Sequence, residues 1–163
     1  MPTTEEYARQ PREQRIRRLG RTADDLAAAI KGRSDAALSR RPDARNWAAK
    51  EVLCHLRDTE EAFASRFEQI LAMEVDPELG APDPDRWAEE RQYLRNDAAE
   101  ALAAFRKRRI ETLETLSRLT SAQWEKGALH PVRGRITIDG FLTLMAWHDD
   151  NHLDQLERAL EGR

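Results

Sequence analysis

Cysteine is almost absent from this sequence, since Cys54 is the only one among 163 residues. A disulfide within the chain is therefore excluded, and a reducing, cytoplasmic setting is favoured. Cys54 precedes His55, so a reactive thiol beside an imidazole is one interpretation. Because lone cysteines are among the most frequently buried residues, we expect a structural role in the core instead.

Long apolar runs and an excess of one charge are also missing. No stretch approaches the roughly 20 apolar residues of a membrane-spanning helix, and the polar N-terminus, MPTTEEYARQ, is unlike a secretory signal. Charged residues form 35% of the chain, yet the net charge is only −3. Acidic residues accompany even the arginine-rich segment 9–21, which indicates a solvated helix face. We therefore expect neither a membrane nor a nucleic acid as partner.

Valine, isoleucine and tyrosine are scarce, whereas alanine, leucine, arginine and glutamate dominate. This bias favours helices over strands, and apolar residues recur at spacings of three and four along four segments. The expected helices span residues 12–31, 47–73, 89–119 and from Thr137 to near the C-terminus. They predict an all-α fold, a four-helix bundle that forms a single domain over residues 1–163.

Two long connections separate these helices. Segment 74–86, EVDPELGAPDPDR, carries three prolines and a glycine, so we expect no helix there. It is long enough to cross the length of a bundle, which would let the second and third helices run parallel; a mobile lid is the functional alternative. Segment 120–136 is expected to be a plain connection without strands. Asn46 and Thr137 are candidate N-caps for the second and last helices.

Three of the four histidines lie on faces that should point inward. His148 and His152 are four residues apart, hence within about 40° of each other on one helix, and His55 lies on the apolar face of the second helix. Buried imidazoles need partners for their nitrogens. A shared metal ion would satisfy all three and leave an open coordination position. The alternative is that each is hydrogen-bonded separately in a wet cleft. The pair occurs as HDDNH, without the glutamate of the zinc-protease HExxH pattern.

Other polar residues surround this candidate metal site in the sequence. We expect the acidic residues that flank the histidine pair to be surface charges: Asp149, Asp150 and Asp154. One of them, or Glu60, could instead orient a ligand imidazole. Trp147 is expected to be a core or interface anchor, and the alternative, since it precedes His148, is that it borders the cleft. Three residues are candidates for the polar lining of the cleft: Arg57, Tyr93 and Arg109. Arg109 lies close to the apolar face of its helix, so it should snorkel or pair with a carboxylate.

Two stretches carry a family resemblance. WAAKEVLCHLRDTEEAFASR (47–66), followed by Tyr93 and then HPVRGRITIDGFLTLMAWHDDNHLDQL (130–156), resembles the DinB/YfiT-like superfamily, with its Trp-led EVL-x-HL segment and its H-x-x-x-H on the last helix. The resemblance covers most of the chain. It implies an up-down-down-up bundle, a homodimer, and a divalent metal ion, most often zinc or nickel, with the ligands His55, His148 and His152. His130 matches a loop histidine of the family, either a substrate contact or an ordinary loop residue.

The resemblance also implies two kinds of chemistry. Some members transfer low-molecular-weight thiols such as bacillithiol or mycothiol, and others are described only as metal-dependent hydrolases. We therefore expect a metal-dependent enzyme that activates water or a thiol and acts on a small-molecule substrate. The alternative is a non-catalytic, metal-binding, stress-related dimeric protein. A cleft too narrow for anything beyond metal and water would favour that alternative.

Overall fold

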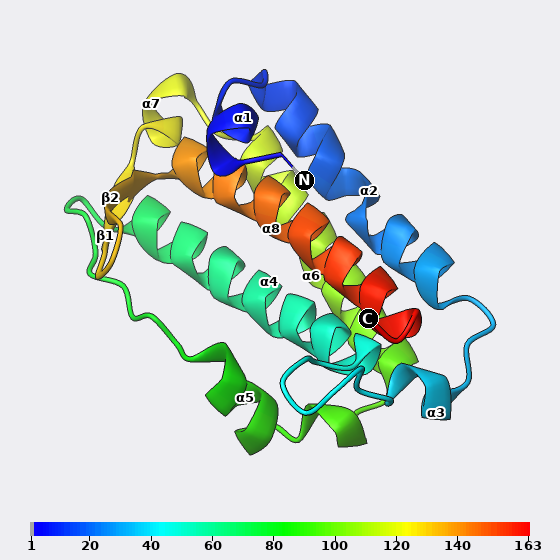
Figure 1. Cartoon of the computed structure of the whole chain (residues 1–163). Helices are drawn as coiled ribbons and strands as arrows, with labels where there is room; N and C mark the ends of the chain where they lie inside the picture. Colours follow the sequence, from blue (N-terminus) through cyan, green and yellow to red (C-terminus); the bar gives the residue numbers. More distant parts are fainter. Residues whose placement is uncertain (1) are drawn as a thin grey trace.

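The computed structural model describes residues 2–163, and four long helices form its body (Figure 1). These are α2 (Arg12–Ile30), α4 (Ala49–Ala72), α6 (Ala98–Ser117) and α8 (Ile138–Leu160). Helices α2 and α8 run in one direction, and α4 and α6 run in the other (Figure 1). Each long helix packs against two others, because α4 and α2 both contact α6 and α8. The predicted up-down-down-up four-helix bundle is confirmed.

Local signals set most of the helix ends. The side chain of Thr137 accepts a hydrogen bond from the Gly140 N–H (3.1 Å), so it caps α8 as predicted. Helix α4 instead has Ala48 as its N-cap, and the Glu51 carboxylate accepts the Ala48 N–H (2.9 Å). Asn46 is therefore not the cap; its side chain donates to Asp43.

The segment between α4 and α6 returns the chain along the bundle, so that these two helices run parallel (Figure 1). It contains α5 (Pro84–Glu90) and the 3₁₀ turn η1 (Tyr93–Arg95). We expected no helix within residues 74–86 and a third helix that begins at residue 89, and both boundaries were wrong. Proline fits the first turn of a helix, which allows α5 to begin at Pro84. Gln92 has a left-handed φ of 49°, which ends the first helical stretch, and Asp97 caps α6.

A small antiparallel hairpin precedes α8, which corrects the prediction that this region contains no strand. It pairs β1 (Gly127–His130) with β2 (Gly134–Thr137). The crossover joins it, because the Leu79 N–H donates to the Leu129 carbonyl and the Leu129 N–H donates to the Pro77 carbonyl, both at 2.9 Å. Strands of four residues show too little alternation to be recognised in a sequence, and tertiary contacts stabilise them. Three short helices complete the fold: α1 (Thr4–Ala8), α3 (Asp35–Leu38) and α7 (Ser121–Trp124).

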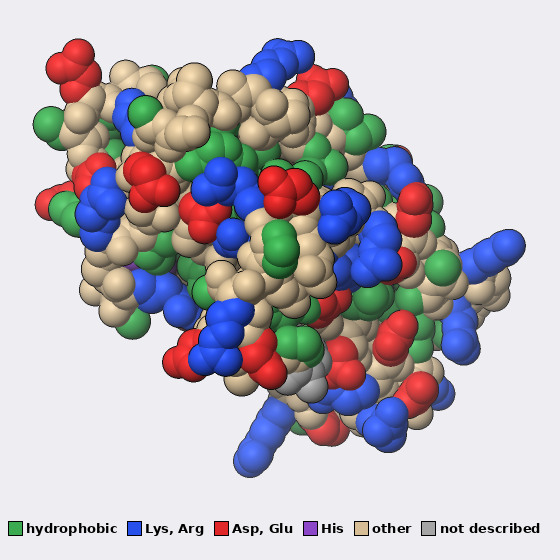
Figure 2. Space-filling model, turned by 90° about the horizontal axis from the view of Figure 1, so that it is seen from above, with side chains coloured by type: hydrophobic (Ala, Val, Ile, Leu, Met, Phe, Trp, Pro, Cys, Tyr) green, Lys and Arg blue, Asp and Glu red, His purple; other side chains and the backbone are tan. Residues whose placement is uncertain are grey.

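The burial of Cys54 and the distribution of surface charge agree with what the composition predicts. Cys54 is fully buried in the core, as expected, and burial raises the pKa of its thiol to about 11. On the face shown in Figure 2, Lys and Arg side chains are interspersed with Asp and Glu, which agrees with the mixed-sign charge of the sequence. None of the helices within residues 2–163 has the length and the hydropathy that crossing a bilayer requires.

Candidate metal centre

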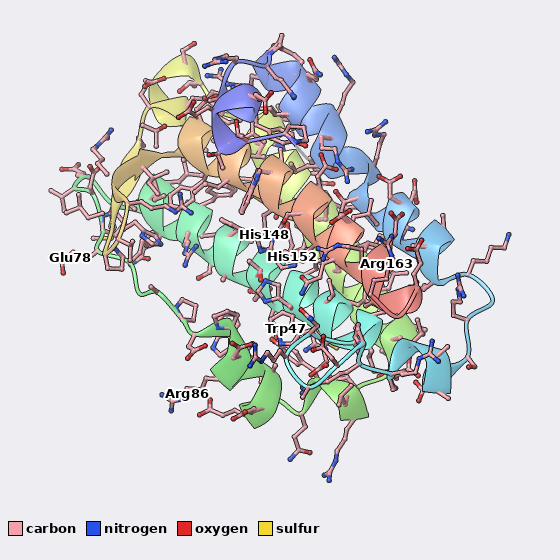
Figure 3. All side chains as sticks on the ribbon, viewed as in Figure 1. Trp47, Glu78, Arg86, His148, His152 and Arg163 are labelled. Carbon is pink, nitrogen blue, oxygen red and sulfur yellow. The ribbon has the colours of Figure 1, made fainter. Side chains whose placement is uncertain are left out.

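The structure brings together the three histidines that the sequence singles out. His55 extends from α4, while His148 and His152 extend from α8 towards α4 (Figure 3). One potential ligand atom from each lies within 4.8 Å of the other two. Among residues 2–163, no other group of three or more potential metal ligands comes together in this way. His55 is buried, and the other two imidazoles are partly exposed, so the cluster is not fully enclosed.

The spacing of the imidazole nitrogens suits a transition metal. Nitrogen ligands at 2.0–2.1 Å from a tetrahedral ion lie about 3.3 Å apart. The Nε2 atoms of His55 and His148 are 3.2 Å apart, close to that value. One ligand atom of His152 lies within 4.8 Å of both other imidazoles, and its ring centroid is 4.5 Å from that of His55 and 4.3 Å from that of His148. The residues present therefore fit a three-histidine site for one divalent ion.

The surroundings hold the three imidazoles in the neutral form that a metal requires. Burial, and secondarily the neighbouring His152, lowers the pKa of His55 to about 3. Burial likewise lowers the pKa of His148 and of His152 below the usual value. Because an unprotonated ring nitrogen is the metal ligand, protons compete weakly for this site at neutral pH.

A side chain missed in the sequence orients one of these rings. Nδ1 of His152 donates a hydrogen bond to Oε1 of Gln155 (2.7 Å), which leaves Nε2 unprotonated and available. Trp47 covers another ring, since its centroid lies 5.1 Å from that of His55. Figure 3 shows Trp47 near the N-terminal end of α4. The tautomer of His152 is thus set by Gln155 of the same helix, and the His55 ring is covered by the residue that precedes the N-cap of α4.

Replacing Gln155 with leucine should weaken metal binding without unfolding the protein. The variant removes the acceptor that fixes the His152 tautomer, and loss of such a partner typically lowers metal affinity about 10- to 100-fold. Competition with a zinc-binding dye measures the change. Gln69→Leu is the matched control, because Gln69 is exposed on α4 away from the three histidines. Equal zinc affinity in both variants would show that Gln155 does not orient a ligand.

Two cavities adjoin the histidine cluster. One, of about 140 Å³, reaches His148 and has an apolar wall that includes Phe63, Phe141 and Trp147. The other, of about 180 Å³, reaches His55 and lies beneath the crossover, at Pro82 and Trp87. Both are larger than metal and water alone require, so the cleft does not have the narrowness that would favour a non-catalytic protein. Trp147 packs against the core, as expected, and also borders the cleft, which was the alternative.

Arg66 and His130 line both cavities. His130 was singled out in the sequence, and the hairpin turn now places it beside the cluster. Arg66 was missed, although a signal existed. It follows His55 by 11 residues, and at about 100° per residue that spacing returns within roughly 20° of the same face of the helix. Thr59 and Ala62 lie between them on this face and line the same cavity.

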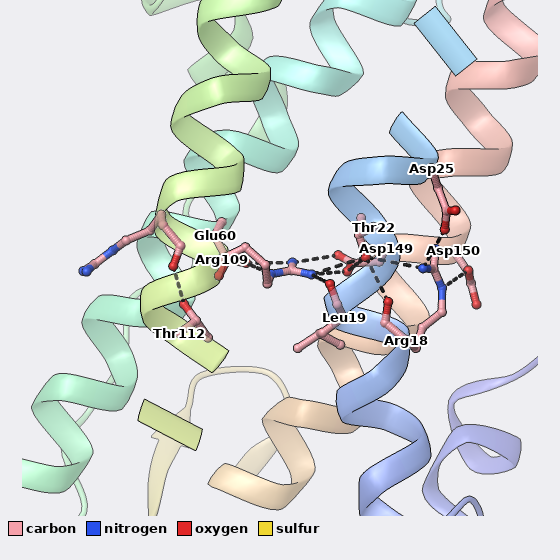
Figure 4. Close-up of polar contacts among 10 residues, drawn as sticks. Arg18, Leu19, Thr22, Asp25, Glu60, Arg109, Thr112, Asp149 and Asp150 are labelled. Atoms are coloured by element: carbon pink, nitrogen blue, oxygen red, sulfur yellow. Dashed lines mark hydrogen bonds and ion pairs between the residues drawn. The ribbon is translucent and has the colours of Figure 1, made fainter. Parts of the chain in front are cut away.

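Arg109 does not line the cleft; it lies at the centre of a buried ionic network (Figure 4). Its guanidinium binds Glu60 of α4 (2.7 Å) and Asp149 of α8 (3.1 Å) and donates to the Leu19 carbonyl of α2 (3.0 Å). Thr22 of α2 also donates to Asp149. Burial alone would lower the pKa of Arg109, but the charges of Asp149 and Glu60 raise it above its usual value. All four bundle helices thus meet at one side chain.

This network corrects the interpretation of the acidic residues beside the histidine pair. Asp149 is only 1% exposed, so the expectation of a surface charge was wrong for this residue. Asp150 is half-buried, accepts hydrogen bonds from Tyr7 and Arg18, and has its pKa raised by burial. Only Asp154 is a surface charge, paired with Arg158 at 2.9 Å. Asp149 therefore anchors α8 next to His148.

The other two predicted cleft residues form a separate cluster. Arg57 donates to Asp58 (2.7 Å), and the Tyr93 hydroxyl donates to the same carboxylate (2.8 Å). Arg91 completes the set at 2.6 Å. None of these residues lines either cavity. Their contacts hold the 3₁₀ turn against α4, so their part is to position the crossover.

An up-down-down-up bundle with three histidines gathered between α4 and α8 defines this chain as a helical protein with a candidate metal centre. Residues 18–156 match the family model of the DinB superfamily, and the chain therefore belongs to that superfamily. The family resemblance of the sequence is confirmed.

Individual relatives agree with this placement. "Putative metal-dependent hydrolase OB0413" of Oceanobacillus iheyensis is 26% identical over 146 residues, which cover 89% of this chain and 79% of that protein. "Putative metal-dependent hydrolase YfiT" of Bacillus subtilis is 28% identical over 108 residues, covering 66% of this chain and 60% of that protein. The solved structure of YfiT, described as a probable metal-dependent hydrolase with an unusual four-helix bundle topology, matches with a TM-score of 0.84. That match covers 98% of this chain and 88% of the other at 23% identity, which shows the shared fold.

Proposed function

We propose that this protein is a metal-dependent enzyme that uses one divalent ion, zinc or nickel, to act on a small molecule. The observation that carries the proposal is the convergence of His55, His148 and His152 beside two cavities. When bound, such an ion supplies a Lewis acid that lowers the pKa of water or of a thiol to near neutrality. The reaction is then hydrolysis or transfer of a low-molecular-weight thiol.

The protein's own residues supply binding, orientation and exclusion of water. The three imidazoles would hold the ion from one side, and the partly exposed faces of His148 and His152 leave its other side accessible. Phe63, Phe141 and Trp147 form a wall that keeps bulk water from the reacting groups. The names of the two curated relatives support hydrolysis as the first reaction to test.

Metal analysis of protein purified without a histidine tag tests the ligand set. We expect about one ion per chain in the wild type and loss of that ion in His55→Ala, His148→Ala and His152→Ala. His130→Ala is the matched control, because His130 lies in the same cleft but outside the cluster, and it should retain the metal. Wild-type protein that stays empty after incubation with zinc and with nickel would contradict the proposal.

Turnover assays separate the two reactions and the non-catalytic alternative. We expect metal-loaded protein to hydrolyse 4-nitrophenyl esters or to conjugate a thiol to 1-chloro-2,4-dinitrobenzene, and each ligand variant to lose at least about 100-fold in rate. Only one of the two assays should respond strongly. Stoichiometric metal without turnover in either assay would instead identify a metal-binding protein and overturn the catalytic part of the proposal.

A further inference from the structure

The cleft beside the three histidines is basic, although the chain as a whole carries a net charge of −3. Arg66 and His130 line both cavities, and Arg133 lines the one that reaches His148. Within the described residues, 2–163, no aspartate or glutamate lines either cavity. A bound divalent cation would add further positive charge. The cleft therefore favours a negatively charged occupant.

Arg66 lacks the carboxylate partner that most arginines of this protein have. Its only hydrogen bond within residues 2–163 is a donation to the Gly80 carbonyl at 3.3 Å, and no ion pair there includes it. The guanidinium lies over two aromatic rings, 5.5 Å from the centre of Phe63 and 6.0 Å from that of Phe141. Burial lowers its pKa, yet a guanidinium remains charged at neutral pH. A half-buried cation with four of its five N–H donors unused is suited to an anion that comes from outside.

His130 adds a hydrogen-bond donor beside this cation. Its Nδ1 accepts hydrogen bonds from the backbone N–H groups of Val132 (3.1 Å) and Arg133 (3.2 Å) in the hairpin turn. In the neutral ring the proton must then be on Nε2, which becomes a donor. Burial, followed by the positive charges of Arg66 and Arg133, lowers the pKa of His130 and so maintains the neutral form.

We propose that Arg66, together with His130 and Arg133 of the hairpin, forms a carboxylate-binding subsite next to the three histidines. The substrate of the enzyme proposed above would then be a small molecule with a carboxylate at one end and an apolar body. That this molecule is a substrate rests on the proposed function, whereas its binding at the subsite does not require the metal.

Three features favour a carboxylate with a small apolar body. The planar guanidinium fork matches the two oxygens of a carboxylate. Phe63, Phe141 and Trp147 provide an apolar wall beside the fork. The cavities, about 140 and 180 Å³, are each below the roughly 300 Å³ at which pockets for drug-sized ligands begin, so the molecule must be small.

Calorimetric titration with phenylacetate, and with the neutral isostere phenylacetamide, tests the subsite. We expect phenylacetate to bind both metal-free and zinc-loaded protein, with quenching of tryptophan fluorescence because Trp87 and Trp147 line the cavities. Phenylacetamide should bind at least about tenfold more weakly. Arg66→Met should weaken phenylacetate binding about 10- to 100-fold, the range for a hydrogen bond to a charged group, and leave phenylacetamide unchanged.

Matched variants separate the subsite from general charge effects and from the metal. Arg95→Met removes a surface arginine that lies outside both cavities, and it should leave phenylacetate binding unchanged. Arg133→Met should weaken binding less than Arg66→Met, and it provides a second measurement if the Arg66 variant does not fold. Metal-free His148→Ala should still bind phenylacetate, so the subsite can be measured even if the protein proves not to be an enzyme.

Four results would overturn the subsite. The first is no phenylacetate binding at about 10 mM, and the second is equal binding of the acid and the amide. The third is wild-type affinity in Arg66→Met. The fourth is binding that requires zinc and disappears in His148→Ala, because the carboxylate would then be a metal ligand. Tighter binding of phenyl phosphate than of phenylacetate would show that the subsite prefers a phosphate, which would contradict the proposal of a carboxylate.

Discussion

Replacing Arg109 with leucine is expected to lower the free energy of unfolding by about 3–5 kcal/mol, the range for removing one partner of a buried ion pair. Arg109, Glu60 and Asp149 are at most 3% exposed. Without the guanidinium, two carboxylates remain in the core with no cation between them, and Oε1 of Glu60 already lacks a hydrogen-bond partner within residues 2–163. Urea unfolding followed by circular dichroism measures the loss.

Arg106→Leu is the matched control for this stability prediction. Arg106 is also on α6, but its ion pair with Asp24 is exposed, with the two side chains 43% and 74% accessible. Such pairs contribute less than about 1 kcal/mol. Substituting Glu60, Arg109 and Asp149 together with apolar residues of similar size should restore much of the stability, since no buried charge then remains unpaired. A loss in Arg109→Leu as small as that in Arg106→Leu would show that the guanidinium is not needed to neutralise the two buried carboxylates.

Zinc is expected to stabilise the folded protein by about 3–4 kcal/mol when its free concentration is 100 to 1,000 times the dissociation constant. The ligands converge only in the folded chain, because His55 and His148 are 93 residues apart in sequence and 3.2 Å apart in space. For a chain of this length the gain corresponds to a rise in Tm of roughly 5–15 °C. Thermal unfolding with zinc and with a chelator measures the shift.

The ligand variants decide whether that stabilisation comes from the three-histidine site. His148→Ala should lose nearly the whole zinc-dependent rise in Tm, whereas His130→Ala should keep it. The reason is that His130 lies in the cleft but is not one of the three clustered ligands. An equal rise in wild type and His148→Ala would place the stabilising zinc elsewhere and argue against the candidate metal centre.

Local patterns in the sequence were sufficient for α2, for α4, for the start of α8 and for the histidine cluster. The bounds of α2 and α4 lie within two residues of those expected from spacings of three and four. The same periodicity placed His55, His148 and His152 on inward faces, and two inward faces in one bundle must meet. The density of prolines after α4 indicated a crossover, which the parallel course of α4 and α6 confirms.

Other features could not be predicted from neighbouring residues. The start of α6 was missed because Leu94 continues the apolar spacing of Ala98 and Leu102 towards the N-terminus, although the backbone breaks at Gln92. The hairpin was missed because each strand has four residues and depends on a bridge to the crossover, between Glu78 and Leu129. Asp149 reads as an ordinary surface charge, since the guanidinium that neutralises it is 40 residues away.

The sequence by itself determined the helical bundle and the inward positions of the three imidazoles, because helical periodicity depends only on residues three or four apart. The tertiary structure alone decided which buried charges have partners. Packing of the helices places two carboxylates, those of Glu60 and Asp149, against Arg109. The crossover and the hairpin form cavities in which Arg66 lies with His130 and Arg133 and, within residues 2–163, with no acidic residue. Coulombic pairing depends on distance in space rather than along the chain, so a buried structural arginine and a cleft arginine look alike in the sequence.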